Sequence, residues 1–191
     1  MGSLSTIAIE LEGIGRILLN RNLGVPIYQR SYAWEDEHVT DLFNDIATAM
    51  SDGAAEYFIG SIVTTKNLDT RAEVADGQQR LATVTIMLGA IRDYLYETGD
   101  KERAAAITGD LLHKKELRTL TLIPKLQLND ADNDFFIKRV LLLPDAPNET
   151  SSQLKRRTSE SIEQPPLLVR MFDRSRVGVM QPTGLLIWFS T

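Results

Sequence analysis

The stretch RAEVADGQQRLATVTIML (residues 71–88) decides the fold, because it passes from a β-rich run through a turn into a helix. Residues 71–75 predict a short strand with Val74 buried. Gly77 then permits a tight turn. The apolar side chains that follow recur at helical spacing, at Leu81, Val84, Leu88, Ile91 and Leu95. The stretch therefore predicts a strand–turn–helix junction.

The junction residues, Asp76 to Arg80, have side chains suited to phosphate. A helix N-terminus presents unpaired N–H groups and a partial positive charge, so it attracts anions. Gln78 and Gln79 add amide donors, and Arg80 adds a guanidinium fork that matches phosphate oxygens. Asp76 either caps the helix or receives a ribose hydroxyl or a metal-bound water. A plain turn with an Asp cap is the commoner structure, so these residues alone leave phosphate binding open.

Upstream, the segment VPIYQRSYAW (residues 25–34) is predicted to begin extended, because Pro26 disfavours the α region for Val25. Arg30 could meet a second phosphate, and an aromatic ring could stack on a base. The competing interpretation places Arg30 in an ion pair and the aromatic side chains in the core beneath the next helix. For Trp34 the core position is favoured, since large aromatic residues dominate cores.

Outward from these segments, helical and β-rich patterns alternate. Helices are predicted over residues 4–19, 35–50, 80–97 and 101–116, and again after the caps at 129–132. Strands are predicted over residues 57–65 and 117–128. Further along, a loop is predicted over 144–152, a polar helix over 153–164, and no periodic element over 165–191. This alternation predicts an α/β fold with a small mixed sheet and flanking helices.

Composition excludes several kinds of site. The 191 residues include no cysteine, which excludes a disulfide scaffold, a thiolate metal site and a cysteine nucleophile. Two histidines are few for a zinc site or a histidine-dependent nuclease. The net charge of -5 argues against strong unaided DNA binding, although it can conceal a local basic patch. Apolar runs are too short to span a membrane and the start lacks a signal-peptide pattern, so we expect a cytoplasmic location.

Three linked segments carry a resemblance to a known family. Residues 25–34, YFIGSIV (57–63) and DGQQRLAT (76–83) resemble the N-terminal domain family of GmrSD-type restriction endonucleases, which are modification-dependent (type IV) enzymes. The similarity covers residues 5–100 in the right order and spacing, and it is looser over 117–142. That family is similar to the ParB and sulfiredoxin fold. The resemblance therefore implies a ParB/sulfiredoxin-like mixed sheet with flanking helices, followed by a mostly helical extension.

The resemblance also implies NTP binding, often with hydrolysis and Mg²⁺, coupled to cleavage of modified phage DNA. It does not distinguish GTP from ATP or another NTP. Modified DNA would be engaged through a partner or a C-terminal domain, and an oligomer is compatible with the pattern. Carried over by position, the catalytic candidate is Asp76, which would hold a metal through water, and the nucleotide-binding candidates are Gln29, Arg30, Gly77, Gln78, Gln79 and Arg80.

The expected organisation has three parts. A ParB/sulfiredoxin-like nucleotide-binding domain spans residues 1–100, a partial helical extension spans 101–164, and an irregular tail spans 165–191. The tail departs from the family pattern, which a truncated gene or a frame shift near residue 160 would explain.

Three functions stay open at this point. The first is an NTP-hydrolysing component of a restriction system; two histidines cannot build the His-Asn-His nuclease often found there, so we do not expect this chain to cleave DNA alone. The second is a non-catalytic nucleotide-binding or protein-interaction module, or a truncated remnant that needs a partner nuclease. The third is a ParB-type DNA-binding regulator, which the acidic balance disfavours.

Overall fold

The computed structural model describes residues 9–65 and 71–142. The chain divides into two compact units. The described residues of the first unit are 9–31, 58–65 and 71–142, and those of the second are 32–57. The loop, polar helix and tail predicted beyond residue 143 lie outside the described residues.

The first unit contains a small mixed sheet in the order β2-β3-β1-β6. The central strand β1 is parallel to both β3 and β6, whereas β2 is antiparallel to β3. A separate antiparallel hairpin joins β4 to β5. The bounds are β1 Leu23–Gly24, β2 Val63–Thr65, β3 Ala72–Asp76, β4 His113–Lys115, β5 Leu122–Pro124 and β6 Leu126–Gln127. The predicted α/β class with a small mixed sheet is confirmed.

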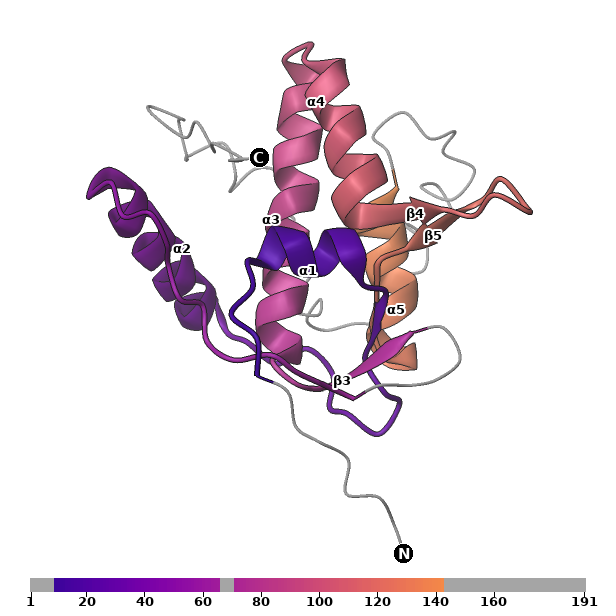
Figure 1. Cartoon of the computed structure of the whole chain (residues 1–191), viewed down its shortest axis with the longest axis horizontal. Coiled ribbons are helices and arrows are strands. Elements are labelled where there is room, and N and C mark those ends of the chain that lie inside the picture. Colours follow the sequence, from indigo (N-terminus) through magenta and orange to yellow (C-terminus); the bar gives the residue numbers. More distant parts are fainter. Residues whose placement is uncertain (1–8, 66–70, 143–191) are drawn as a thin grey trace, which may run out of the picture. The chain divides into compact units, whose positions relative to one another are not determined.

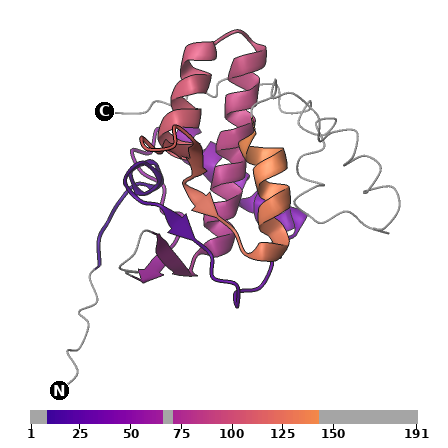
Figure 2. The same ribbon diagram turned by 90° about the vertical axis from the view of Figure 1, so that its right-hand side faces the viewer.

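Two helical segments of this unit pack against α3, the longest of those described, and α1 packs against one of them, η1 (Figures 1 and 2). Their bounds are α1 Ile14–Asn20, α3 Gln78–Glu97, α4 Lys101–Ala106 with its π-helical continuation η1 Ile107–Leu112, and α5 Asp130–Phe136 with its π-helical continuation η2 Ile137–Leu141. The start of α3, from Gln78 to Ile86, is buried except for part of Arg80. At Gly89 a Cβ would lie 3.0 Å from a methyl carbon of Val140, so glycine permits the close approach of η2.

Arg92 joins α3 to the end of η2 by hydrogen bonds. Its side chain is fully buried and donates to the carbonyl oxygens of Val140, Leu141 and Leu142, each at 2.9 Å. Asp93 balances the charge with a carboxylate oxygen 2.7 Å from the guanidinium. A helix end leaves carbonyls without intrahelical partners, and one guanidinium satisfies three of them here.

Two predicted elements are shorter in the structure. Residues 9–13 are not helical, and α1 begins only at Ile14, because Gly13 is its extended N-cap residue and Ile9 and Leu11 are exposed. The strand predicted over 57–65 is confined to 63–65, because Gly60 has a φ of 99°, which a continuous strand does not accommodate.

The region after residue 100 also differs from the prediction. The helix expected to reach residue 116 ends at Leu112, and His113–Lys115 forms β4 instead. The single strand expected over 117–128 is divided into β5 and β6. One long strand and two short strands that meet at Pro124 and Lys125 would show the same alternation of leucines. The pattern therefore could not predict the division.

The second unit's described residues are built on α2, Asp36–Ser51. A capping box starts the helix: the Glu35 side chain accepts the backbone N–H of His38, and the Glu35 N–H donates to His38 Nδ1 at 3.2 Å. Trp34 is half-buried and stacks on the His38 ring, with ring centroids 6.1 Å apart. The core position favoured for Trp34 is thus only partly realised, because its ring lies on an exposed neighbour.

Candidate functional site

The centre of the candidate site is the turn between β3 and α3. Gly77 is the N-cap residue of α3, with φ 87° and ψ 8°, and no side chain caps the helix. A Cβ at Gly77 would lie 3.0 Å from the carbonyl oxygen of Ser61 and 3.1 Å from Cα of Ile62. Positive φ and this close approach both require glycine. The tight strand–turn–helix junction is confirmed.

Asp76 does not cap α3. The interpretation of the junction as a plain turn with an Asp cap, which the residues alone left open, is therefore wrong. Its carboxylate is 63% exposed and lies 3.8 Å from Nη2 of Arg80. The carboxylate is therefore open to solvent, next to a guanidinium on the first turn of the helix. An exposed carboxylate beside an anion-attracting helix end is one that a bound cation or water can reach.

The structure turns the two glutamines inward. Gln78 Nε2 donates to the carbonyl of Arg30 at 2.7 Å, and Gln79 Nε2 approaches the carbonyl of Ser31 at 3.4 Å. Both side chains are buried. In this arrangement the amides hold the segment of residues 26–31 against the start of α3, and each uses at least one amide N–H group for that purpose.

The segment 26–31 is fixed from two further sides. Gln29 Nε2 donates to the carbonyl of Ala75 at 3.1 Å, at the end of β3. Asn129 Nδ2 donates to the carbonyl of Gln29 at 3.1 Å. The guanidinium of Arg30 is exposed and makes no ion pair with the described residues. A bound anion could therefore meet Arg30 without displacing a described carboxylate from it.

Asn129 helps to fix the segment of residues 26–31, a role that the sequence did not predict. It is 4% exposed and also caps α5, accepting the backbone N–H of Asp132 at 3.2 Å. The capping role could be read from its position before the helix, and it is confirmed. Its contact with Gln29, 100 residues earlier, has no local sequence signal.

Arg80 lies against the other flanking segment, residues 59–62. A Cβ at Gly60 would lie 1.9 Å from Nη1 of Arg80, so the guanidinium occupies the space that a larger residue would take. Nη1 also makes a long contact of 3.5 Å with the carbonyl of Ile59. The side chain remains 25% exposed. Arg80 is consequently both a packing residue and a cation available at the helix start.

All these parts lie at one edge of the sheet. Strands β1, β3 and β6 are parallel, so their carboxyl ends point the same way. Residues 26–31 follow β1, Gly77 follows β3, and Asn129 follows β6. Open α/β sheets bind ligands outside the carboxyl ends of parallel strands. The topology thus brings the predicted residues Gln29, Arg30, Asp76, Gly77, Gln78, Gln79 and Arg80 together.

The side chains at this edge that could meet a ligand are two guanidinium groups and one exposed carboxylate. In residues 9–65 and 71–142, no three His, Asp or Glu residues lie close enough together to hold a metal ion. His113 lies in β4, where burial lowers its pKa. A cation here would rely on Asp76 and on oxygens of the bound ligand, as Mg²⁺ commonly does with phosphates.

Comparison with known proteins points in one direction. A family model described as the GmrSD restriction endonuclease N-terminal domain matches residues 14–174. No curated protein matches the chain. None of the described helices is long and apolar enough to cross a membrane.

Proposed function

The chain belongs to the family of GmrSD restriction endonuclease N-terminal domains, and on this premise we propose that it is the nucleoside-triphosphate-binding domain of its restriction system. Family membership indicates a component of a restriction endonuclease that acts in phage defence. Binding and hydrolysis of the nucleotide, and coupling to recognition of modified DNA, are the proposed additions. Cleavage itself is assigned to a partner or to another domain.

The start of α3 supports phosphate binding. The helix has 20 residues and begins at Gly77, where no side chain makes a capping hydrogen bond. Arg80 on its first turn and exposed Arg30 on the adjacent loop add two guanidinium groups of the kind that bind phosphate oxygens in pairs. Hydrogen bonds to charged groups contribute about 1.5–3 kcal/mol each.

The residues present fit a magnesium ion bound with the nucleotide. Asp76 is an exposed carboxylate 3.8 Å from Arg80, and Mg²⁺ in nucleotide sites is often held by one or two carboxylates together with phosphates. Asp76 would hold the ion through a water molecule. When bound, the ion would neutralise charge on the phosphates, while Arg80 and the helix start would orient them.

The decisive experiment is a thermal-shift series on the full chain with GTP, ATP, CTP and UTP, with and without magnesium. A nucleotide present at 100 times its Kd should stabilise the protein by about 2.7 kcal/mol. Arg80→Ala should weaken binding by about 1.5–3 kcal/mol. Arg103→Ala is the matched control, because Arg103 is an exposed arginine on α4 that pairs with the N-cap residue Asp100. Absence of any stabilising nucleotide would refute the proposal.

Asp76→Asn separates catalysis from binding. The neutral amide keeps the size of the side chain but cannot supply the negative charge that orients a magnesium-bound water. We expect retained nucleotide binding and loss of most NTP hydrolysis in an assembly where the native chain is active. Hydrolysis at the native rate would remove Asp76 from the catalytic machinery.

One observation favours a second candidate, a non-catalytic nucleotide-binding module. Gln78 and Gln79 bind backbone carbonyls of residues 30 and 31, which suits a structural role for part of the motif. In that case nucleotide would still stabilise the chain, but neither the chain nor its assembly would release phosphate. A phosphate-release assay on both distinguishes the two functions.

A further inference from the structure

The β4–β5 hairpin is the feature outside the nucleotide site that carries a further inference. It projects away from the helices of its unit as a two-stranded arm (Figure 1). Its base is fixed: the backbone N–H of Lys125 donates to the carbonyl of Leu112 at 2.9 Å, and Lys125 Nζ donates to the carbonyl of Leu19 at 2.6 Å. Because β5 leads directly into β6, the arm continues the edge strand of the main sheet.

The loop of this arm is internally ordered. The N–H of Leu120 donates to the carbonyl of Glu116 at 2.8 Å, and the N–H of Glu116 donates to the carbonyl of Thr121 at 2.9 Å. The Thr119 hydroxyl lies 3.2 Å from the Glu116 carboxylate and 2.6 Å from the Thr121 hydroxyl. The only carboxylate of the arm is therefore turned back into the loop.

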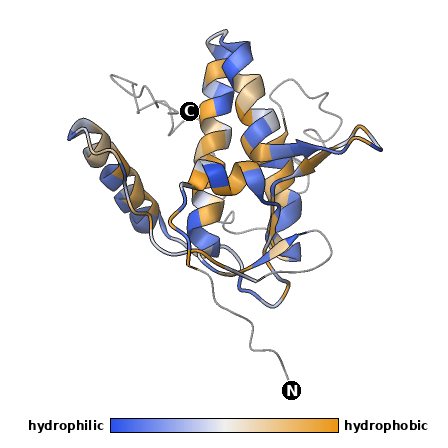
Figure 3. Cartoon of the chain, in the orientation of Figure 1, coloured by the Kyte–Doolittle hydropathy of each residue, from blue (hydrophilic) through white to orange (hydrophobic). Residues whose placement is uncertain are grey.

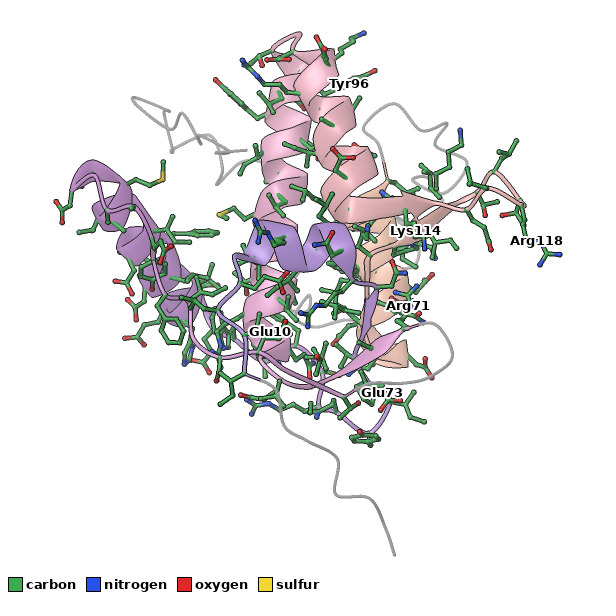
Figure 4. The ribbon with its side chains drawn as sticks, viewed as in Figure 1. Glu10, Arg71, Glu73, Tyr96, Lys114 and Arg118 are labelled. Carbon is green, nitrogen blue, oxygen red and sulfur yellow. The ribbon has the colours of Figure 1, made fainter. Side chains whose placement is uncertain are left out.

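The arm presents three cations that are not neutralised by described carboxylates. Lys114, Lys115 and Arg118 are exposed and make no ion pair with the described residues, and Figure 4 shows Arg118 at the far end of the arm. Three cations against one carboxylate stand out in a chain of net charge -5. This is the local basic patch that an acidic composition can conceal.

The loop also presents apolar side chains at a structural cost. Leu117, Leu120 and Leu122 are 83%, 67% and 51% exposed, and Figure 3 shows hydrophobic residues on the arm among hydrophilic ones. Leu120 has a φ of 57°, a conformation that Asn or Gly adopts with less strain. Exposure and strain at one leucine, without burial among the described residues in return, point to a contact made with something beyond them.

We propose that the β4–β5 hairpin is a DNA-binding arm that places its three cations on duplex phosphates and its leucines against base edges in the major groove. A two-stranded ribbon fits a groove about 12 Å wide and about 8.5 Å deep. Five residues of extended chain reach roughly 16 Å, enough to pass the backbone and approach the bases. The proposal rests on the restriction function proposed above, because it identifies where this chain would contact the DNA.

The three cations predict how strongly DNA binding should depend on salt concentration. Neutralising three phosphates contributes a slope of about -2.7 to the logarithm of the association constant against the logarithm of salt concentration. Those contacts alone would weaken binding by about 40-fold between 50 and 200 mM salt.

The test measures binding of the full chain to a short fluorescein-labelled DNA duplex by anisotropy over this salt range. The variant Lys114→Ala/Lys115→Ala/Arg118→Ala should bind more weakly, with a salt slope smaller by about 2–3. The matched control, Lys101→Ala/Arg103→Ala/Lys138→Ala, removes the same charge from side chains that already contact Tyr96, Asp100 and Asp134. The control should bind as the native chain does.

A second variant, Leu117→Ser/Leu120→Asn, tests the apolar contact and suits the backbone at residue 120. It should lose affinity several-fold with an unchanged salt slope. Equal DNA binding by the native chain and both arm variants would overturn the proposal, as would a native chain that binds no duplex at low salt. Loss of self-association with unchanged DNA binding would instead make the arm a protein contact.

Nucleotide stabilisation, measured on the same proteins, separates this proposal from the previous one. Both arm variants should keep the native thermal shift, because the arm holds none of the nucleotide candidates. Arg80→Ala should lose that shift and keep the salt slope of DNA binding. DNA binding without any nucleotide effect would refute the nucleotide site and leave the arm supported.

Discussion

Gly77→Ala is the substitution for which the structure gives the sharpest stability prediction. Two costs combine at this position. An L-residue at a φ of 87° costs about 1–2 kcal/mol. The new methyl group would also lie 3.0 Å from the Ser61 carbonyl oxygen and 3.0 Å from Cγ1 of Ile62, and such overpacking adds about 1–3 kcal/mol.

Gly99→Ala provides the control that isolates the second cost. Gly99 has a φ of 93°, but nothing lies within 4 Å of the position that its new methyl group would take. It should lose about 1–2 kcal/mol, from the backbone term alone. Gly77→Ala should therefore be the less stable of the two by about 1–3 kcal/mol.

Urea unfolding of the full chain, followed by circular dichroism, measures the difference. With an m-value of about 2 kcal/mol/M, the two midpoints should differ by about 0.5–1.5 M. Equal midpoints would refute the reasoning, because they would mean that residues 61–62 do not pack against the turn. An altered m-value would show that one variant changed more than the local packing.

Three further predictions concern buried polar groups. Arg92→Met should destabilise the fold by about 3–5 kcal/mol in urea unfolding, because it leaves the carbonyls of residues 140–142 without donors; native stability in this variant would contradict the role of Arg92. Burial lowers the pKa of His113 from 6.5, so the unfolded state binds more protons and stability should fall as pH drops below 6.5. His113→Gln should flatten that part of the pH profile, and an unchanged profile would exclude His113 as the cause. Asn129→Ala should cost about 1–3 kcal/mol by leaving the Gln29 carbonyl unpaired and removing the cap of α5, whereas the exposed substitution Asn44→Ala should cost little; equal effects would argue against both contacts of Asn129.

The junction was predictable because its signals are local. Gly77, the buried Val74 and the apolar stripe beginning at Leu81 lie within eight residues, and each follows from a backbone or burial rule. The chemistry of the glutamines was less predictable. The local sequence does not reveal whether a glutamine amide donates to a ligand or to a backbone carbonyl. The carbonyl partners of Gln78 and Gln79 each lie 48 residues away.

Residues 57–65 show why a β-rich composition overpredicted a strand. β-branched and aromatic residues favour an extended backbone, and this favoured β2 at residues 63–65. At Gly60, however, the backbone turns to positive φ where the guanidinium of Arg80 lies. That guanidinium comes from 20 residues further along the chain, so no window around Gly60 contains the cause.

The pairing of β1 has a consequence for how this molecule acquires its site. Its two strand partners lie far along the chain: Leu23 pairs with Ala72 on one side and with Leu126 on the other. Parallel pairing over such separations forms only after long loops have closed, which makes it slow compared with helix formation. A nascent chain that has reached residue 100 has neither β6 nor Asn129, so one edge of β1 and the carbonyl of Gln29 are still without their partners. The candidate site is therefore assembled late in folding, and a fragment that stops at residue 100 would expose an edge of β1 that β6 covers in the 191-residue chain.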